Sequence, residues 1–418
     1  MRRRSIYLAA TAMSAALVLA GCSATEQPAS TPTATEPEAS AEAQEREELN
    51  VNLIAAAWAN DLDTSRELIE SGADVNAKDS TSQSAYLIAT SEGYLPLLEL
   101  TLQNGADVTS LDSWDGTGAI RAGERGHADI VGRLVQAGID LDHVNNLGWV
   151  ALHEALVFAK ADQVDAYVDT VRVLVAGGAD VTIPSERDGK TPVELADENS
   201  LSQQSELLRA AAADDESEGE VGDANQRLLA AAQDGDADAA ALALRAGADL
   251  ETRNDLEQTP LLLASANDHV DVARLLVALG ADPDALDHQH DTPWLVTGVT
   301  GSVAMLEALL PADPDMSIPN RFGGLSPIPA GERGHADYMK RVASTGVDLD
   351  HVNDLGWTAL LETIIFGDGS QRYQDIVTTL IDAGVDVTIA DKSGVTPLEH
   401  AQSRGYGNIA AALEAAAR

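Results

Sequence analysis

Residues 122–156 read AGERGHADIVGRLVQAGIDLDHVNNLGWVALHEAL, and residues 330–364 read AGERGHADYMKRVASTGVDLDHVNDLGWTALLETI. The two stretches are 208 residues apart and are identical at 22 of 35 positions. Upstream of them, SGADVNAKD at Ser71 matches AGADLETRN at Ala246 with an offset of only 175 residues. The two offsets differ by 33 residues, so the 418-residue chain is an internal duplication built from units of about this length. The second half contains one extra unit.

Each unit repeats the same signals for the start and the end of a helix. The threonine of a Thr-Pro-Leu string is a good helix cap, and the proline fits the first turn, where a missing N–H costs nothing. Leucine and alanine at helical spacing then form a buried stripe. The glycine of a later Gly-Ala-Asp string predicts a helix end in the left-handed conformation. The starts are Thr191-Pro192-Val193, Thr259-Pro260-Leu261, Thr292-Pro293-Trp294 and Thr396-Pro397-Leu398, and the ends are Gly72, Gly105, Gly178, Gly247 and Gly280.

This pattern resembles the ankyrin repeat, which is 33 residues long. The resemblance implies an all-α repeat fold, a solenoid of helix–turn–helix units with β-hairpin fingers, arranged here as two stacked arrays. The predicted units start near Leu49, Ser80, Ser113, Asn146 and Glu186, and then near Asp223, Asp255, His288, Arg321, Asp354 and Lys392. The same unit is lengthened in each half, near residues 160–165 and 367–372, between its two helices.

The first and last units of each half predict where the arrays end. The units at Leu49 and Asp223 begin without Thr-Pro-Leu, and the units that end near residues 213 and 418 lack Gly-Ala-Asp. Terminal repeats of a solenoid are atypical in this way because they cap its core. We therefore expect an array of about five repeats at residues 49–213, an acidic linker at residues 214–223 (DDESEGEVGD), and an array of about six repeats at residues 224–418. Two solenoids joined by a flexible linker is the favoured arrangement, and one continuous superhelix is the alternative.

The first 22 residues predict a lipoprotein signal peptide. Arg2, Arg3 and Arg4 precede an apolar run at residues 6–20, and Leu19-Ala20-Gly21-Cys22 resembles a bacterial lipobox. The single cysteine of the chain, Cys22, is then the lipidation site, whereas a plain signal peptide or an uncleaved anchor is the alternative. Residues 23–48 are rich in Pro, Thr, Ser and Glu and predict a disordered tether. The expected location is exported, with the lipid holding the protein at the outer face of the bacterial cytoplasmic membrane or in the periplasm.

The net charge of −42 restricts the partners of the protein. Nucleic-acid binding needs clustered Lys and Arg, so we expect no nucleic-acid partner. Anionic headgroups are repelled as well, so the lipid on Cys22 is the only expected membrane contact. Solubility or salt adaptation explains this acidity, and a cationic partner or divalent ions are the alternative.

Strings that resemble catalytic motifs are incomplete. Gly189-Lys190-Thr191 lacks the upstream glycine of a phosphate-binding loop, and His153-Glu154 lacks the second histidine of a zinc protease. No nucleophile–base grouping or dinucleotide fingerprint is present, so we expect no enzyme activity, no catalytic residue and no cofactor. We predict no metal site, although weak transition-metal binding at His288 and His290 stays open.

The duplicated stretch also supplies candidate binding residues. In ankyrin proteins, partners bind to the finger tips and to the inner helices of the concave face. Trp, His and Arg are typical interface anchors. The predicted protein-binding residues are Glu124, Arg125, His143, Trp149 and Glu154 in the first half and Glu332, Arg333, His351, Trp357 and Glu362 in the second. The alternative is that Trp149 packs against its own fingers and that the match only records the duplication.

The second half also resembles a group of short exported bacterial ankyrin proteins, through residues 330–364, Gly369 and residues 396–406. It departs from their pattern at Leu325-Ser326-Pro327, where a distorted helix start is expected, and the first half departs at Val150 and His153. We predict a monomeric, membrane-anchored interaction module that docks another extracytoplasmic protein. The alternatives are an accessory or protective factor for an exported stress enzyme, such as a peroxide-detoxifying one, and a toxin-immunity or effector protein.

Overall fold

The computed structural model describes residues 36–214 and 221–418, in which all regular secondary structure is helical. These residues form 22 α-helices and one 3-10 helix, and none of them is in a β-strand. The signal segment with Cys22, the tether residues 23–35 and the linker residues 215–220 lie outside the described residues.

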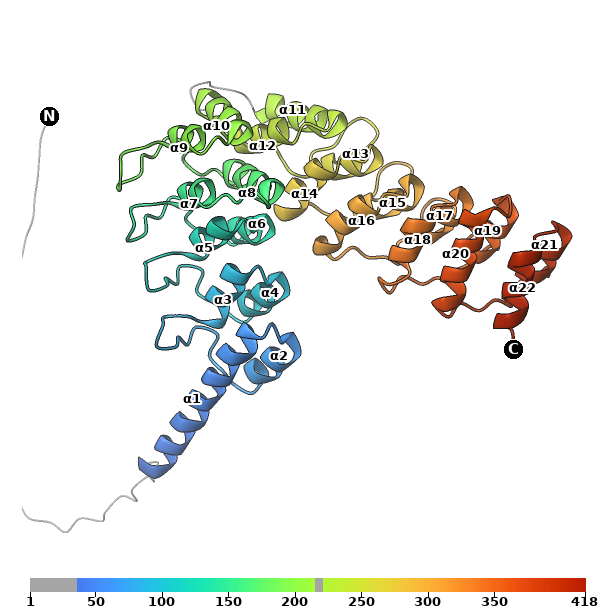
Figure 1. The fold of residues 1–418 in the computed structure, drawn as a ribbon, viewed down its shortest axis with the longest axis horizontal. Helices are drawn as coiled ribbons and strands as arrows, with labels where there is room; N and C mark the ends of the chain where they lie inside the picture. The colour runs from blue at the N-terminus through green and yellow to red at the C-terminus, as the bar shows by residue number, and fades with distance from the viewer. Residues whose placement is uncertain (1–35, 215–220) are drawn as a thin grey trace, which may run out of the picture. The chain divides into compact units, whose positions relative to one another are not determined.

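The helices follow one another as pairs, five before the linker and six after it (Figure 1). The first helices of the pairs are α1 (Glu36–Trp58), α3 (Ala85–Glu92), α5 (Gly118–Arg125), α7 (Ala151–Val157), α9 (Pro192–Glu198), α11 (Val221–Asp234), α13 (Pro260–Ala266), α15 (Pro293–Thr300), α17 (Pro327–Arg333), α19 (Ala359–Phe366) and α21 (Pro397–Ser403). The second helices are α2 (Leu62–Glu70), α4 (Leu95–Gln103), α6 (Ala128–Gln136), α8 (Val164–Ala176), α10 (Ser202–Asp214), α12 (Ala237–Arg245), α14 (Val270–Ala278), α16 (Val303–Leu309) with the 3-10 turn η1 (Leu310–Ala312), α18 (Ala336–Val342), α20 (Gln371–Asp382) and α22 (Gly407–Ala416).

The capping signals of the sequence are confirmed. The side chain of Thr259 accepts a hydrogen bond of 3.2 Å from the backbone N–H of Leu262, and Pro260 occupies the first position of α13. Gly280, which follows α14, has φ +92°, a conformation that favours glycine. The expected distortion at α17 is also found: its cap Ser326 is already in the helical region and makes no side-chain cap bond.

The fingers are hairpin-shaped loops rather than β-hairpins. In the finger before α7, the N–H of Asn145 donates to the carbonyl of Trp149 at 3.0 Å, and Oδ1 of Asn145 accepts from the N–H groups of Leu147 and Trp149. One asparagine therefore closes the turn, and the finger is too short for a ladder of strand hydrogen bonds. The predicted finger shape is therefore present in the described residues, without any β-strand.

Stacking of successive pairs builds the core. In residues 46–418, which form one compact unit, the first helices pack on the first helices of neighbouring pairs, and the second helices pack on the second helices. Small and branched side chains such as Ala122, Leu134 and Leu152 fill the thin layers between them and are fully buried. Each repeat thus contacts mainly its neighbours, as in other solenoids.

The two arrays also contact each other along their second helices, since α12 packs against α8 and α14 packs against α6 and α8. The buried Arg172 of α8 binds Asp238 of α12 at 2.6 Å, and Arg274 of α14 binds Asp169 of α8 at 2.9 Å. A Cβ at Gly132 of α6 would lie only 2.2 Å from the carbonyl oxygen of Ala278, so α6 can come this close to the end of α14 only with a glycine at this position.

These contacts correct the predicted domain organisation. The arrays are not connected by the linker alone, and the second array does not simply continue the stack of the first, because its second helices lie against α6 and α8. The boundaries of the linker and the tether also change: Asp214 ends α10, residues 221–223 begin α11, and residues 36–48 are part of α1. The helical signal there is the run of Ala and Glu, which are strong helix formers.

Candidate protein-binding surface

Each array contains one buried glutamate that is bound by an asparagine of the preceding finger. Nδ2 of Asn145 donates to Oε1 of Glu154 at 2.8 Å, and Nδ2 of Asn353 donates to Oε1 of Glu362 at 2.9 Å. The two glutamates are 3% and 5% exposed. Burial raises the pKa of each carboxyl group to about 7, although the amide hydrogen bond lowers it in part.

A tryptophan and a phenylalanine form an edge-to-face pair in each array. The ring centroids of Trp149 and Phe158 are 6.1 Å apart, and those of Trp357 and Phe366 are 5.6 Å apart, with interplanar angles of 75° and 74°. The same asparagine that binds the glutamate also binds the backbone N–H of the tryptophan. Phe158 and Phe366 are 41% and 51% exposed, so both pairs open to solvent.

The two aromatic pairs differ in what covers the tryptophan. In the first array, the guanidinium of Arg187 lies 5.1 Å from the ring centroid of Trp149, and the indole N–H donates to Oγ of Ser185 at 3.1 Å. In the second array, Trp357 is half-buried, and among the described residues neither a cation over its ring nor an acceptor for its N–H is present.

The predicted charged pairs lie at the ends of α5 and α17. Glu124 accepts from Arg121 at 2.7 Å, and Arg125 binds Glu92 of the preceding repeat at 3.0 Å, so both side chains are engaged within the array. Among the described residues, the side chains of Glu332 and Arg333 bind only each other, at 3.2 Å, and Arg333 is exposed. The second array therefore presents the more accessible pair.

His143 and His351 connect neighbouring fingers. Nε2 of His143 lies 2.8 Å from the carbonyl oxygen of Asp115, and Nε2 of His351 lies 2.6 Å from that of Gly323. Both rings are half-buried, which indicates that they fix the spacing of the fingers.

Three of the predicted contact residues need correction. Trp149 is 8% exposed and packs against its own fingers, and Glu154 and Glu362 lie behind the surface, so none of the three side chains faces a partner directly. Sequence reasoning missed the exposed Phe158 and Phe366, which match each other at the same 208-residue offset but lie just outside the quoted stretches.

The finger tips carry a second set of matched apolar side chains. Trp114 and Phe322 occupy equivalent positions and are 57% and 55% exposed, and the next tip in the second array carries Leu355, which is 54% exposed. Neighbouring tips are joined by backbone bonds: the N–H of Asn146 donates to the carbonyl of Trp114, and that of Asp354 to the carbonyl of Phe322. Apolar groups exposed in such a row are typical of a docking surface.

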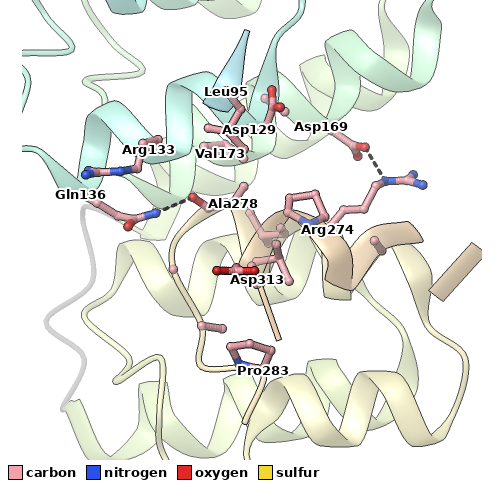
Figure 2. Close-up of a pocket in the computed structure, with 18 of the residues that line it drawn as sticks. Leu95, Asp129, Arg133, Gln136, Asp169, Val173, Arg274, Ala278, Pro283 and Asp313 are labelled. Carbon is pink, nitrogen blue, oxygen red and sulfur yellow. Dashed lines mark hydrogen bonds and ion pairs between the residues drawn. The ribbon is translucent and has the colours of Figure 1, made fainter. Parts of the chain in front are cut away.

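A separate pocket of about 660 Å³ lies where the arrays meet, between helices α4, α6 and α8 of the first array and α14, α16 and η1 of the second. Figure 2 shows Gln136 bound to the carbonyl of Ala278 and Arg274 bound to Asp169 across this junction. The other guanidinium of the pocket wall, on Arg133, binds Glu99 at 2.5 Å. Both cationic groups thus serve the packing of the helices.

The described residues contain no group of three or more His, Cys, Asp and Glu side chains placed to hold a metal ion. Nδ1 of His288 lies 3.0 Å from the carbonyl oxygen of Leu256, a contact between neighbouring fingers. In the part of the chain that the structure describes, every helix is too short or too polar to cross a membrane.

Paired helices, finger loops and a stacked core define a solenoid of the kind that serves as a binding surface. The family model described as "Ankyrin repeats (3 copies)" matches residues 85–185 and 228–320, and the model of the single "Ankyrin repeat" matches residues 53–80. The chain is 38% identical over 189 residues to the ankyrin repeat protein YahD of Escherichia coli (strain K12), covering 45% of this chain and 94% of that protein. The chain belongs to the ankyrin-repeat proteins, which are in general non-enzymatic modules that bind other proteins.

Two solved structures are similar to part of the chain. An ankyrin repeat domain from Acinetobacter baumannii AYE is 39% identical, with a TM-score of 0.44, over 46% of this chain and 97% of that chain. The ankyrin repeat protein EF0377 is 36% identical, with a TM-score of 0.44, over 47% of this chain and 98% of that chain.

Proposed function

We propose that this protein is an extracytoplasmic protein–protein interaction module, anchored to a membrane by a lipid on Cys22. Its docking surface is formed by the finger tips and the first helices of the two arrays. The observation that carries the proposal is that the exposed aromatic side chains, Phe158 with Phe366 and Trp114 with Phe322, lie at matched positions in both arrays.

The physical argument rests on the cost of exposing these side chains. A phenylalanine or tryptophan that is about half exposed leaves apolar area in water, and covering this area by a partner is favourable by roughly 25 cal/mol per Å². Large aromatic side chains dominate the energetics of protein interfaces. The buried Asn–Glu pair behind each site fixes the finger and the tryptophan, so the phenylalanine has a rigid support.

The proposed location is supported by residues 2–22. Three arginines, an apolar run and the string Leu19-Ala20-Gly21-Cys22 together are typical of lipoprotein signal peptides. The high acidity of the chain gives it little attraction to anionic lipids, so stable attachment depends on the acyl chains.

The docking surface can be tested by photo-crosslinking in cells that express the full chain. A photoreactive phenylalanine analogue is placed at position 366, and in a control chain at position 164, where Val164 is 51% exposed in the first turn of α8. We expect one discrete crosslinked protein from position 366, weakened by Trp114→Ser with Phe322→Ser. Equal crosslinking from both positions, or none from position 366, would contradict the proposed surface.

The anchor is tested separately with Cys22→Ala. We expect the native chain to incorporate labelled fatty acid and to fractionate with membranes, and the variant to do neither. A Cys22→Ala chain that still fractionates with membranes would show that lipidation is not the attachment.

A further inference from the structure

The two arrays contain the same aromatic site, but only one of them carries its own cation. Arg187 belongs to the finger that follows Trp149, and its guanidinium stacks over the indole ring at 5.1 Å from the centroid. The corresponding finger of the second array carries Lys392, whose ammonium instead donates to the carbonyl of Asp354. The ring of Trp357 is left without the contact that the ring of Trp149 has.

The exposure of the two sites agrees with this difference. Trp149 is 8% exposed and its indole N–H is bound by Ser185, whereas Trp357 is half-buried and its N–H has no acceptor among the described residues. Phe366 is 51% exposed, against 41% for Phe158. Among the described residues, the second site therefore has no guanidinium stacked on its tryptophan, which is the contact that Arg187 makes in the first.

We propose that the Trp357–Phe366 site binds an arginine side chain of the partner protein, in the place that Arg187 fills in the first array. The guanidinium stacks on the indole ring, which attracts cations through its negative face. This inference rests on the proposed function and specifies the chemistry of the partner at one position. In the first array an arginine of the chain itself stacks on the tryptophan, and in the second array the equivalent tryptophan is available to an arginine of a partner.

The charge of the protein favours the same occupant. The chain has 26 Lys and Arg against 68 Asp and Glu, so a partner segment with arginine is attracted to it over a long range. In the same finger as Trp357, three residues before it, Asp354 is exposed at the tip. An arginine is preferred to a lysine here because its flat guanidinium stacks on aromatic rings.

The test uses the indole N–H signals of the five tryptophans in a ¹⁵N NMR titration of the folded chain. The probes are acetyl-arginine methylamide and the neutral isostere acetyl-citrulline methylamide, and Trp357→Phe and Trp149→Phe assign the two signals. We expect a saturable shift of the Trp357 signal with the arginine probe, with an apparent affinity about three- to tenfold above that for citrulline, the range expected for a cation–π contact. Equal responses to the two probes, or no response of Trp357, would overturn the proposal.

Arg187→Ala provides the matched control, because Arg187 is exposed and its removal opens the first site without touching the core. We expect Trp149 to be silent in the native chain and to respond to the arginine probe in this variant. A silent Trp149 in a variant whose other indole signals are unchanged would refute the equivalence of the sites. The NMR probes need no partner protein, so the two proposals can fail separately. If the crosslinking test fails but the Trp357 signal responds to the arginine probe, the proposed function is rejected while the arginine-binding site is retained.

Discussion

Replacing both buried glutamates by glutamine, Glu154→Gln with Glu362→Gln, is expected to stabilise the protein in alkaline but not in acidic solution. Glutamine keeps the oxygen that accepts the hydrogen bond from Asn145 or Asn353, but it cannot ionise. Burial raises the pKa of both glutamates to about 7, from the value of 4.5 expected in the unfolded chain. The folded state therefore binds the proton more tightly than the unfolded state.

The sign of the effect follows from proton linkage. Below pH 4.5 both states carry protonated glutamates, and the native chain and the variant should be about equally stable. As the pH rises from about 4.5 through 7, the unfolded chain releases these protons while the folded chain still holds them, so the native chain loses stability that the variant keeps. A raised pKa of this size corresponds to roughly 3 kcal/mol per glutamate, since one pKa unit is about 1.4 kcal/mol.

The assay is urea denaturation at pH 5 and pH 8.5, followed by tryptophan fluorescence. We expect the midpoint of the variant to exceed that of the native chain by about 1 M urea or more at pH 8.5, given typical urea slopes, and by much less at pH 5. The control is Glu206→Gln, an exposed position on α10, which should leave both midpoints unchanged. A variant that is less stable than the native chain at pH 8.5, or equally shifted at both pH values, would refute the reasoning.

Two further predictions concern the packing of the repeats. Gly132→Leu should separate the arrays while leaving each folded, because the leucine side chain would collide with the carbonyl of Ala278. We expect a larger radius of gyration in solution scattering and an unchanged helical circular-dichroism signal. An unchanged radius of gyration would contradict this prediction. Thr396→Ala should destabilise the last repeat by about 1 kcal/mol, because the variant lacks the hydroxyl that accepts a hydrogen bond from the backbone N–H of Glu399. Thr396→Ser keeps a hydroxyl at this position and should retain the native stability. Hydrogen exchange should then be faster in α21 and α22 only, and uniform acceleration along the chain would argue against a local cap.

The contact between the arrays uses residues that differ between the two copies. Gly132 corresponds to Lys340 at the 208-residue offset, and Lys340 is exposed on α18. Arg172 lies on α8 and Thr378 on α20, the matching helix of the other array, and Thr378 is exposed. In the first copy, Gly132 and Arg172 thus contact the second array, whereas Lys340 and Thr378 of the second copy are exposed.

The sequence predicted the repeat count and the helix signals because these depend on local chemistry. A threonine cap, a proline in the first turn and a glycine with positive φ act within a few residues, and their spacing gives the period of 33 residues. The candidate site was predicted in part for the same reason, since the duplication marked its Trp and Glu positions.

Local signals could not predict which side chains are buried or which residues of other repeats they contact. Whether Trp149 is an exposed anchor or a covered ring depends on Ser185 and Arg187, which are more than 30 residues away along the chain. The pairing of α8 with α12 likewise depends on long-range contacts such as that of Arg172 with Asp238. Local signals along the chain determined the fold of each repeat. The docking of the arrays and the accessibility of the two tryptophans were decided only by the tertiary structure, because packing between distant segments sets which side chains water can reach.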